Sequence, residues 1–446
     1  MSDPAWSPDA RGKTLTRLNS RRVLDNPSRE LGPVFNTIPG WAEVDTSTVV
    51  TERISGAMTN LVFRSTCPTA EAYPTVIVRL FGPGNSLFSQ KEERDVFLLA
   101  GQTGIGPRCL VEFEGGRVEE FIPGATLSAA TMRAPEIVQL TATALAVFHV
   151  RMTAQRAARG AVGANDQPAI FRRIGKWHAT ATGLAPALLQ ELGLEDVMDE
   201  VAQLRRYHES TFPLWLGFCH NDLQYGNMLL CPGRDASPQG SPAGPAEESA
   251  TPPGSPRAVL ASGDALGLSY PSADPGLAAA AGGGDATPEP GSPPSPRAAT
   301  EHIRLIDYEY ATLNDVAFDV ANHWCEYAAD YHSGEAHVLD FAALPGDEQK
   351  AAFAEAYADA MLAQAAAGAG RLAERVCAGE VDAGCREHGA LARLLVQKAE
   401  AYVPLSHLKW GLWGVMQAQT SDVDFDYLEY ARQRIAQYHA TKTRYL

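Results

Sequence analysis

Three side chains with oxygen donors, Asp222, Asn227 and Asp307, are of the types that phosphoryl transfer requires. Such a reaction needs a carboxylate that accepts the proton of the attacking hydroxyl. It also needs an amide and a second carboxylate as ligands of Mg²⁺, which prefers oxygen donors. Alternatively, the two acids cap turns and Asn227 forms an Asx turn, which is a purely structural use of the same residue types.

The sequence around these residues predicts that strands position them. An apolar run over 216–219 precedes Asp222, and a second apolar run over 228–230 follows Asn227. This pattern is typical of a strand, a polar loop and a second strand, with the acid and the amide on the loop. The alternating run 303–306 predicts another strand, which ends on the second acid.

Two longer segments resemble a known family. The segments H-N-D-L-Q-Y-G-N-M-L-L and I-D-Y-E-Y-A-T-L-N-D-V-A-F-D-V-A-N-H-W-C-E-Y are similar to motifs of the choline/ethanolamine kinase family, in the same order. The resemblance implies an enzyme that uses ATP and Mg²⁺ to phosphorylate an amino alcohol for phospholipid synthesis. It implies that Asp222 is the catalytic base and that Asn227 and Asp307 complete the catalytic set as metal ligands. Asp319 is expected to brace the catalytic loop.

The same resemblance implies an α+β fold with two lobes, similar to that of protein kinases. We expect a loose leader over residues 1–40 with at most one short helix, a sheet-rich, ATP-binding N-lobe over 41–122, and a large helical, catalytic C-lobe over 123–446. Residues 232–300 are rich in Pro, Gly, Ala and Ser, which predicts a disordered insertion at a hairpin tip. The insertion is either a spacer or, through Ser-Pro pairs such as Ser255-Pro256, a target of phosphorylation.

A turn of small residues between two strand patterns predicts a phosphate-binding loop. The turn contains Ser55, Gly56 and Asn60, and small residues let main-chain N–H groups approach a phosphate closely. An ordinary hairpin would explain the same pattern. The resemblance favours ATP binding through these three residues, because the family has a similar loop at this place.

A single charge lies in the apolar strand pattern 75–82. Arg79 is costly to bury there unless it is paired. The resemblance implies that Arg79 holds the nucleotide phosphates, where protein kinases use a lysine. It also implies that Glu93, in the helix expected over 91–100, is the acidic partner of Arg79. Glu92 is an alternative partner, and a solvated position on the helix is an alternative for Glu93.

Aromatic residues near the C-terminus predict a site for a cation. A quaternary ammonium has no N–H to donate, so aromatic faces and a carboxylate must hold it, at about 0.5–2 kcal/mol per cation–π contact. Trp410 and Trp413 are three positions apart and share one side of a helix. The segment W-G-L-W is similar to the family's cation-binding helix. This implies a substrate site formed by Trp410, Trp413, Tyr430, Tyr331 and the negative charge of Glu326, with core packing as the alternative for each.

The substrate remains open between two amino alcohols. The segment E-Y-A-A-D-Y-H is more similar to plant-type choline kinases than to ethanolamine kinases, so we expect choline, with ethanolamine as a second substrate. The alternatives are an ethanolamine kinase proper, a kinase for another small molecule such as an aminoglycoside or a sugar, and a catalytically dead nucleotide-binding scaffold. The tryptophan pair disfavours the second alternative, and the intact catalytic set disfavours the third. The resemblance also suggests a homodimer.

The composition of the whole chain excludes several classes of partner. A net charge of −16 over 446 residues disfavours nucleic acid and anionic membranes, which need a basic patch. No apolar run is long enough to span a bilayer, and the N-terminus has no signal-peptide core. The seven cysteines include no C-x-x-C pair, which is typical of reduced thiols in the cytosol. We therefore expect a cytoplasmic protein without a membrane span.

Overall fold

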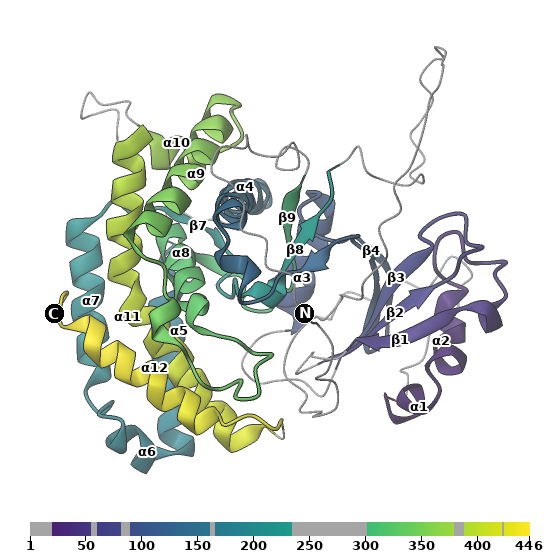
Figure 1. Ribbon diagram of the computed structural model, residues 1–446, viewed down its shortest axis with the longest axis horizontal. Coiled ribbons are helices and arrows are strands. Elements are labelled where there is room, and N and C mark those ends of the chain that lie inside the picture. The colour runs from purple at the N-terminus through teal and green to yellow at the C-terminus, as the bar shows by residue number, and fades with distance from the viewer. Residues whose placement is uncertain are drawn as a thin grey trace, which may run out of the picture.

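A five-stranded antiparallel sheet and a larger helical part make up the described chain, and Figure 1 shows them side by side. The structure, a computed structural model, describes residues 20–54, 60–81, 90–160, 166–233, 301–378, 388–421 and 423–446. The expected α+β fold is confirmed, because the sheet comes first in the chain and helices predominate after it. The lobe boundaries stay a prediction.

The N-terminal sheet places two arginines next to each other. Its strands are β1 (Val50–Ile54), β2 (Asn60–Thr66), β3 (Thr75–Phe81), β4 (Cys109–Phe113) and β5 (Gly116–Glu120), and helix α3 (Gln90–Gln102) connects β3 to β4. The order β1-β2-β3-β5-β4 makes β3 the central strand. Arg79 on β3 is opposite Arg117 on β5. Because opposite residues of an antiparallel pair project to the same face, both arginines face the same side of the sheet.

The described part of the predicted N-terminal leader, residues 20–40, contains more helix than we expected. Two helices, α1 (Ser20–Asp25) and α2 (Pro27–Phe35), stand where the sequence predicted at most one. The side chain of Asn26 caps α2 by accepting a hydrogen bond from the Arg29 main-chain N–H at 3.3 Å, and Pro27 occupies the first turn, where its missing N–H has little cost. The apolar face of α2 is buried in the core of the sheet through Leu31, Val34 and Phe35. The Asn-Pro pair and this helical spacing were the available signals.

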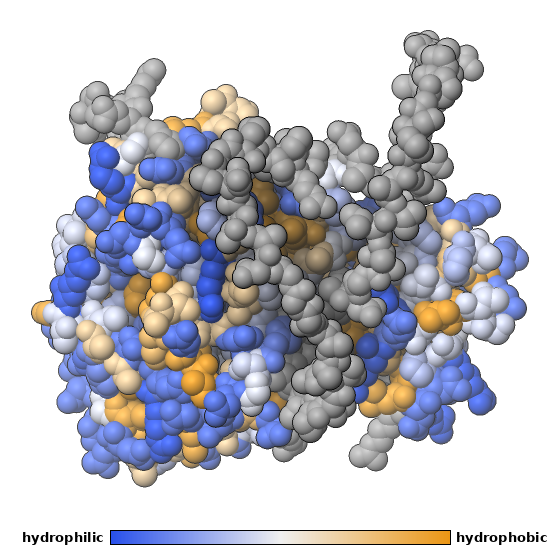
Figure 2. Space-filling view, in the orientation of Figure 1, coloured by the Kyte–Doolittle hydropathy of each residue, from blue (hydrophilic) through white to orange (hydrophobic). Residues whose placement is uncertain are grey.

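The helical part is built around two long helices, α4 and α11. Its helices are α4 (Pro135–Ala158), α5 (Ala169–Leu184), α6 (Pro186–Glu191), α7 (Val197–Thr211), α8 (Val316–Cys325), α9 (Asp347–Ala366), α10 (Arg371–Ala378), α11 (His388–Thr420) and α12 (Tyr427–Lys442). Helix α4 packs on α9, and α11 packs on α5, α8, α9 and α12. The face of the molecule in Figure 2 is mostly hydrophilic, with apolar patches between the hydrophilic areas. Apolar side chains of these helices form one buried core cluster.

Helix α4 is the one described helix that is long and apolar enough to cross a membrane. However, 61% of its most apolar stretch is buried inside the fold, against α9 and β7 among others. A core helix meets the same criteria of length and composition as a membrane span. The burial therefore identifies α4 as a core helix.

The strands that the sequence predicted around the catalytic set belong to two small sheets. Strand β7 (Leu216–Cys219) pairs with β10 (Thr312–Asp315), and β8 (Met228–Cys231) lies between β6 (Ala125–Thr126) and β9 (His302–Leu305). The last residue of β8 pairs with the first residue of β9, as expected for an insertion at a hairpin tip. The inserted segment itself lies, apart from its first two residues, outside the described residues.

Two histidines of the helical core lie where a proton is poorly tolerated. His208 in α7 stacks on Tyr402, with 3.8 Å between ring centroids, and its Nε2 lies 3.1 Å from the Ala401 carbonyl oxygen. His323 in α8 uses Nδ1 to contact the Leu223 carbonyl oxygen at 2.9 Å. The other ring nitrogen of each has no hydrogen-bond partner among the described residues, so protonation would bury an unpaired N–H. Burial lowers the pKa of both histidines to about 4.

Acid should therefore destabilise the fold between pH 6.5 and about 4, where the unfolded chain binds protons that folded His208 and His323 do not bind. Because the folded-state pKa is the lower one, the stabilising contribution is complete above pH 6.5 and is lost as the pH falls toward 4. From pH 7 to pH 5, each histidine should remove on the order of 2 kcal/mol from the free energy of unfolding. His208→Phe should abolish its share, as measured by urea unfolding at pH 5, 6 and 7. The same loss in variant and wild type would contradict this prediction.

Candidate active site

The three residues of the predicted catalytic set lie together at the ends of short strands. Asn227 donates from Nδ2 to the main-chain oxygen of Asp222 at 2.8 Å and to its carboxylate Oδ2 at 3.1 Å. The N–H of Ile306 donates to the main-chain oxygen of Asn227 at 3.0 Å, which ties Asp307, the next residue, to the same loop. The structure brings the three side chains to one place, as an active site requires.

Two residues of this region adopt the left-handed backbone conformation, Asn221 with φ of 63° and Asp307 with φ of 65°. Such a conformation costs on the order of 1–3 kcal/mol and persists only where the surroundings hold it. The Nδ2 of Asn221 donates to the carbonyl oxygens of Cys219 and Tyr310, both at 3.1 Å, and its Oδ1 accepts a bond from Asn314 at 3.0 Å. The loop is therefore held in a strained shape by its own side-chain bonds.

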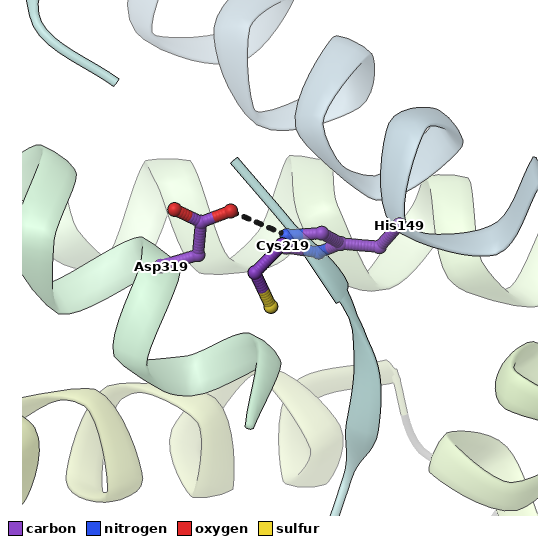
Figure 3. A group of neighbouring side chains, drawn as sticks. All are labelled: His149, Cys219 and Asp319. Carbon is purple, nitrogen blue, oxygen red and sulfur yellow. Dashed lines mark hydrogen bonds and ion pairs between the residues drawn. The ribbon is translucent and has the colours of Figure 1, made fainter. Parts of the chain in front are cut away.

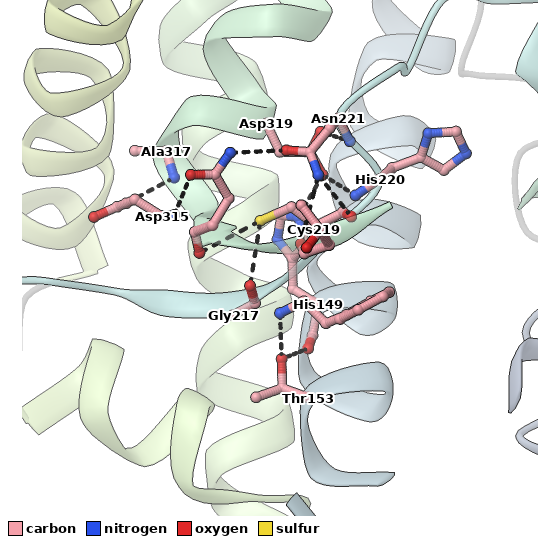
Figure 4. A network of polar contacts seen from close by, with 12 residues as sticks. His149, Thr153, Gly217, Cys219, His220, Asn221, Asp315, Ala317 and Asp319 are labelled. Carbon is pink, nitrogen blue, oxygen red and sulfur yellow. Dashed lines mark hydrogen bonds and ion pairs between the residues drawn. The ribbon is translucent and has the colours of Figure 1, made fainter. Parts of the chain in front are cut away.

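Asp319 on α8 braces the same loop, as the resemblance implied. Its Oδ2 accepts the main-chain N–H of His220 at 2.6 Å, and its Oδ1 accepts that of Asn221 at 2.7 Å. Nε2 of His149, from α4, lies 2.9 Å from Oδ2. Figure 4 shows how Asp319 gathers these contacts. Burial alone would raise the pKa of Asp319, but the bonds from His149 and the main chain outweigh it and lower the pKa, so the brace stays ionised.

Within the described residues, His149, Cys219 and Asp319 have the side-chain types of a metal site, and their donor atoms lie within 4.8 Å of one another (Figure 3). Each donor atom already has a partner in the protein. Nδ1 of His149 lies 2.7 Å from the Tyr357 hydroxyl, and the thiol of Cys219 contacts the carbonyl oxygen of Gly217 at 3.6 Å. These contacts, with the bonds that Asp319 makes, identify a buried structural network.

Several carboxylates lie near Asp222. Burial raises the pKa of Asp222 well above its ordinary value, Lys409 opposes this, and Glu326 and Asp307 add to it. Burial likewise raises the pKa of Glu309, and the charges of Asp307 and Asp222 raise it further. A group of neighbouring acids that resists ionisation is favourable for binding a cation.

The donor set of this cluster fits Mg²⁺, which prefers oxygen ligands. The side chain of Asp307 is 36% exposed. Asn227 makes its two bonds to Asp222 through Nδ2, which leaves the Oδ1 atom as an oxygen donor. Glu309 belongs to the same group of charges. Glu309 was not predicted from the sequence, although its position two residues after Asp307 in an alternating segment was a signal for it.

A pocket with apolar walls lies between the sheet and the helical part, next to the catalytic set. Its lining includes Ile54, Ile77, Leu229 and Ile306, together with Arg79 and Asp307. Apolar walls together with a few charged side chains suit a nucleotide base with its phosphates. Of the predicted phosphate loop, Asn60 begins β2, whereas Ser55 and Gly56 lie outside the described residues.

The predicted pair between Arg79 and Glu93 is wrong. Nε of Arg79 donates to Glu119 at 2.7 Å, and its guanidinium lies 3.9 Å from Asp307. Glu93 instead binds Arg117 through two bonds of 2.7 and 2.8 Å, and Nε of Arg117 donates to Glu119 at 2.8 Å. The pairing of β3 with β5 explains the error, because it inserts Arg117 and Glu119 between Arg79 and α3. Charged residues in a buried strand must be paired, so the segment R-V-E-E was the signal for them.

This chain of charges holds Arg79 ionised beside the catalytic set. Burial lowers the pKa of Arg79, but Glu119 and Asp307 outweigh this effect and hold the pKa above its ordinary value. Arg79 is 8% exposed and lines the pocket. A buried guanidinium that is fixed by a strand and an acid is well placed to bind phosphate oxygens.

The predicted substrate residues form one aromatic cluster between α11, α12 and the segment after α8. The Trp413 ring makes edge contacts with Trp410 and Tyr430, with centroid distances of 5.6 and 5.9 Å. Tyr331 donates its hydroxyl proton to Glu326 at 2.7 Å. All five predicted residues are 8% exposed or less. The structure therefore brings the five predicted residues together. This arrangement agrees with an aromatic cation site and equally with ordinary core packing.

Two cations of this cluster were not predicted. Arg434, fully buried on α12, donates to Glu326 at 2.6 Å and to the Tyr430 hydroxyl at 3.0 Å. Lys409 places its Nζ 3.9 Å from the centre of the Trp410 ring. Glu326 is thus already paired, and its negative charge is shared with an internal cation. Lys409 within the apolar stretch of α11 was a local signal, whereas α12 carries several charged residues and nothing local marked Arg434.

Comparisons with known proteins agree with this geometry. Residues 51–439 match the family model described as choline/ethanolamine kinase. The chain is 30% identical to probable choline kinase 3 of Arabidopsis thaliana over 99% of this chain and 96% of that protein. It is 26% identical to a choline/ethanolamine kinase of Homo sapiens, over 97% and 88% of the two chains. A crystal structure of choline kinase from Cryptosporidium parvum has the same fold, with a TM-score of 0.62, 21% identity and coverage of 94% and 96%. The chain belongs to the choline/ethanolamine kinase family and is an ATP-using enzyme of that family.

Proposed function

We propose that the protein transfers the γ-phosphoryl group of ATP to the hydroxyl of choline and, as a second substrate, of ethanolamine. The observation that supports this most is the position of the catalytic set directly beside the aromatic cluster. Lys409 contacts both the main-chain oxygen of Asn221, before Asp222, and the Trp410 ring. An alcohol whose ammonium lies among the rings would have its hydroxyl near Asp222.

The residues of the chain have separate tasks in this reaction. Asp222 accepts the proton of the attacking hydroxyl, and its raised pKa favours that step. Arg79 binds the ATP phosphates at the end of the apolar pocket. Asn227 and Asp307 would hold Mg²⁺, which would neutralise the negative charge of these phosphates.

The contacts of Glu326 favour choline over ethanolamine. A primary ammonium needs hydrogen-bond acceptors, and the two oxygens of Glu326 already accept bonds from Arg434 and Tyr331. A quaternary ammonium needs no acceptor and is held by ring faces. The ring-rich surroundings of this cluster, with the charge of Glu326 shared with Arg434, therefore support choline as the preferred substrate.

The test is ADP release by the purified protein with ATP and Mg²⁺, with choline and ethanolamine offered separately. We expect turnover with both alcohols and a higher kcat/KM for choline. A higher value for ethanolamine would reverse the preference. The absence of ADP release above the ATP-only background with either alcohol would contradict the proposal and favour the nucleotide-binding scaffold.

The ring of Trp413 offers a separate test of the cation site. Trp413→Ala removes one aromatic face, which should raise KM for choline about 5- to 30-fold, equivalent to about 1–2 kcal/mol. KM for ATP should stay within about twofold, because the nucleotide pocket lies elsewhere. Trp413→Phe keeps a ring and is the matched control, with an intermediate KM. An unchanged KM for choline in Trp413→Ala would identify Trp413 as a packing residue.

A further inference from the structure

A lysine is buried at the centre of this site. Lys409 lies in α11 with no exposed surface. Its Nζ donates to the main-chain oxygen of Asn221 at 2.6 Å. The same atom lies 3.9 Å from the centre of the Trp410 ring and 5.2 Å from that of Tyr310. The ammonium thus connects the loop that carries Asp222 to the tryptophan helix.

Such a position is unfavourable for a lysine. Burial and the nearby charge of Arg173 together lower the pKa of Lys409 to about 7, against the opposing charges of Asp222, Asp319 and Glu326. An apolar residue would fill the same place between rings without this desolvation cost. A buried, perturbed side chain in an active site is a candidate for a functional role.

The bond from Lys409 acts on the peptide that leads into Asp222. The peptide unit is planar, so the carbonyl of Asn221 and the N–H of Asp222 turn together. Asn221 has the strained φ of 63°, and Asp319 holds its N–H from α8 at 2.7 Å. Lys409 holds its carbonyl from α11 at 2.6 Å. The residue before Asp222 is thus held at its N–H by α8 and at its carbonyl by α11.

We propose that Lys409 is a positioning residue that holds the Asn221 carbonyl and thereby orients Asp222 toward the alcohol. This inference rests on the proposed role of Asp222 as the base. It assigns to Lys409 an effect on the chemical step and none on the binding of ATP. A misplacement of about 1 Å in a catalytic group can lower the rate by about 10²-fold.

The test uses Lys409→Met, which keeps the length of the side chain and removes its donor and charge. We expect kcat to fall at least tenfold, with KM for ATP within twofold of wild type. If Lys409 acts through Asp222, the same change in an Asp222→Asn background should lower kcat less than threefold, because residues that act as a unit are not additive. A radiolabelled-product assay measures these low rates.

Lys398→Met is the matched control. Lys398 is also a buried lysine of α11, but its Nζ pairs with Asp315 at 2.7 Å and lies over the Trp215 ring, so it does not hold the Asn221 carbonyl. The kcat of Lys398→Met, counted per folded molecule, should stay within threefold of wild type. If Lys409→Met does not fold, as judged by its thermal unfolding, Lys409→Leu, which also has no donor, takes its place in the same comparison.

Two results would overturn the inference. One is a kcat for the Lys409 variant within threefold of wild type. The other is an equal fold-loss in the wild-type and Asp222→Asn backgrounds, which would identify a structural role. Wild-type protein is assayed in parallel with choline and ethanolamine, so a failure of the proposed function appears as an inactive wild type. An active wild type with an equally active variant contradicts only the role of Lys409.

Discussion

Asp222→Asn is expected to lower kcat by about 10³-fold, since general-base assistance is typically worth about 10²–10⁴ in rate. The amide cannot accept the proton of the attacking hydroxyl. It keeps the size of the carboxylate and an oxygen that can accept the bond from Asn227, so the loop should stay folded. ADP release with choline measures kcat, and thermal unfolding checks the fold. KM for ATP should stay within about twofold.

The control for this variant is Asp330→Asn. Asp330 is an exposed acid next to Tyr331 that caps a local turn through the His332 N–H at 3.1 Å. Its replacement changes the net charge by the same amount and should leave kcat within about twofold, as expected for a surface position. If Asp222→Asn kept more than about a tenth of wild-type activity, Asp222 would not be the base.

Asp307→Asn is expected to lower kcat/KM by about 10²–10³-fold at low millimolar Mg²⁺, through the loss of a charged ligand. The Mg²⁺ concentration for half-maximal activity should rise at least about tenfold, because an amide is a weaker ligand than a carboxylate. Asp307 is partly exposed and lies 3.9 Å from Arg79, so the change leaves no unpaired charge in the core. Activity titrated with Mg²⁺, with ATP in each assay, measures the effect.

An exposed acid of the sheet provides the control for the magnesium titration. Glu52 on β1 pairs with Arg64 at the surface. Glu52→Gln should therefore leave the Mg²⁺ requirement unchanged. An unchanged requirement in Asp307→Asn as well would mean that Asp307 does not bind the metal.

The strands and the loop that carry the predicted catalytic set could be predicted because they are encoded locally. The pattern of strand, polar loop and strand places Asp222 and Asn227 on one loop, and the structure has β7 and β8 where that pattern predicted strands. The alternating run before Asp307 is β9. The segments that resemble the family lie in the same region, and the family match extends over residues 51–439. Short-range patterns of this kind depend on neighbours in the chain, which the sequence displays directly.

The partners of the buried charges could not be predicted in this way. Glu93 was assigned to Arg79, but the register of β3 and β5 gives it Arg117 and gives Arg79 to Glu119, 40 positions away. A strand register is set by the burial of a whole sheet face, so it is a property of the assembled sheet. The sequence predicted that Arg79 needs a partner, and only the sheet decided which one.

The sequence by itself determined the fold class and the family, and it predicts the chemistry of Asp222. Only the tertiary structure decided how the charges of the site are balanced. Glu326 meets Arg434 across 108 positions, and Lys409 meets the Asn221 carbonyl across 188. A buried charge must be compensated by whatever lies next to it in space, because burial removes the water that would otherwise solvate it. Which residues become neighbours is set by the packing of α11 and α12 against the catalytic loop and α8, and therefore by the whole core.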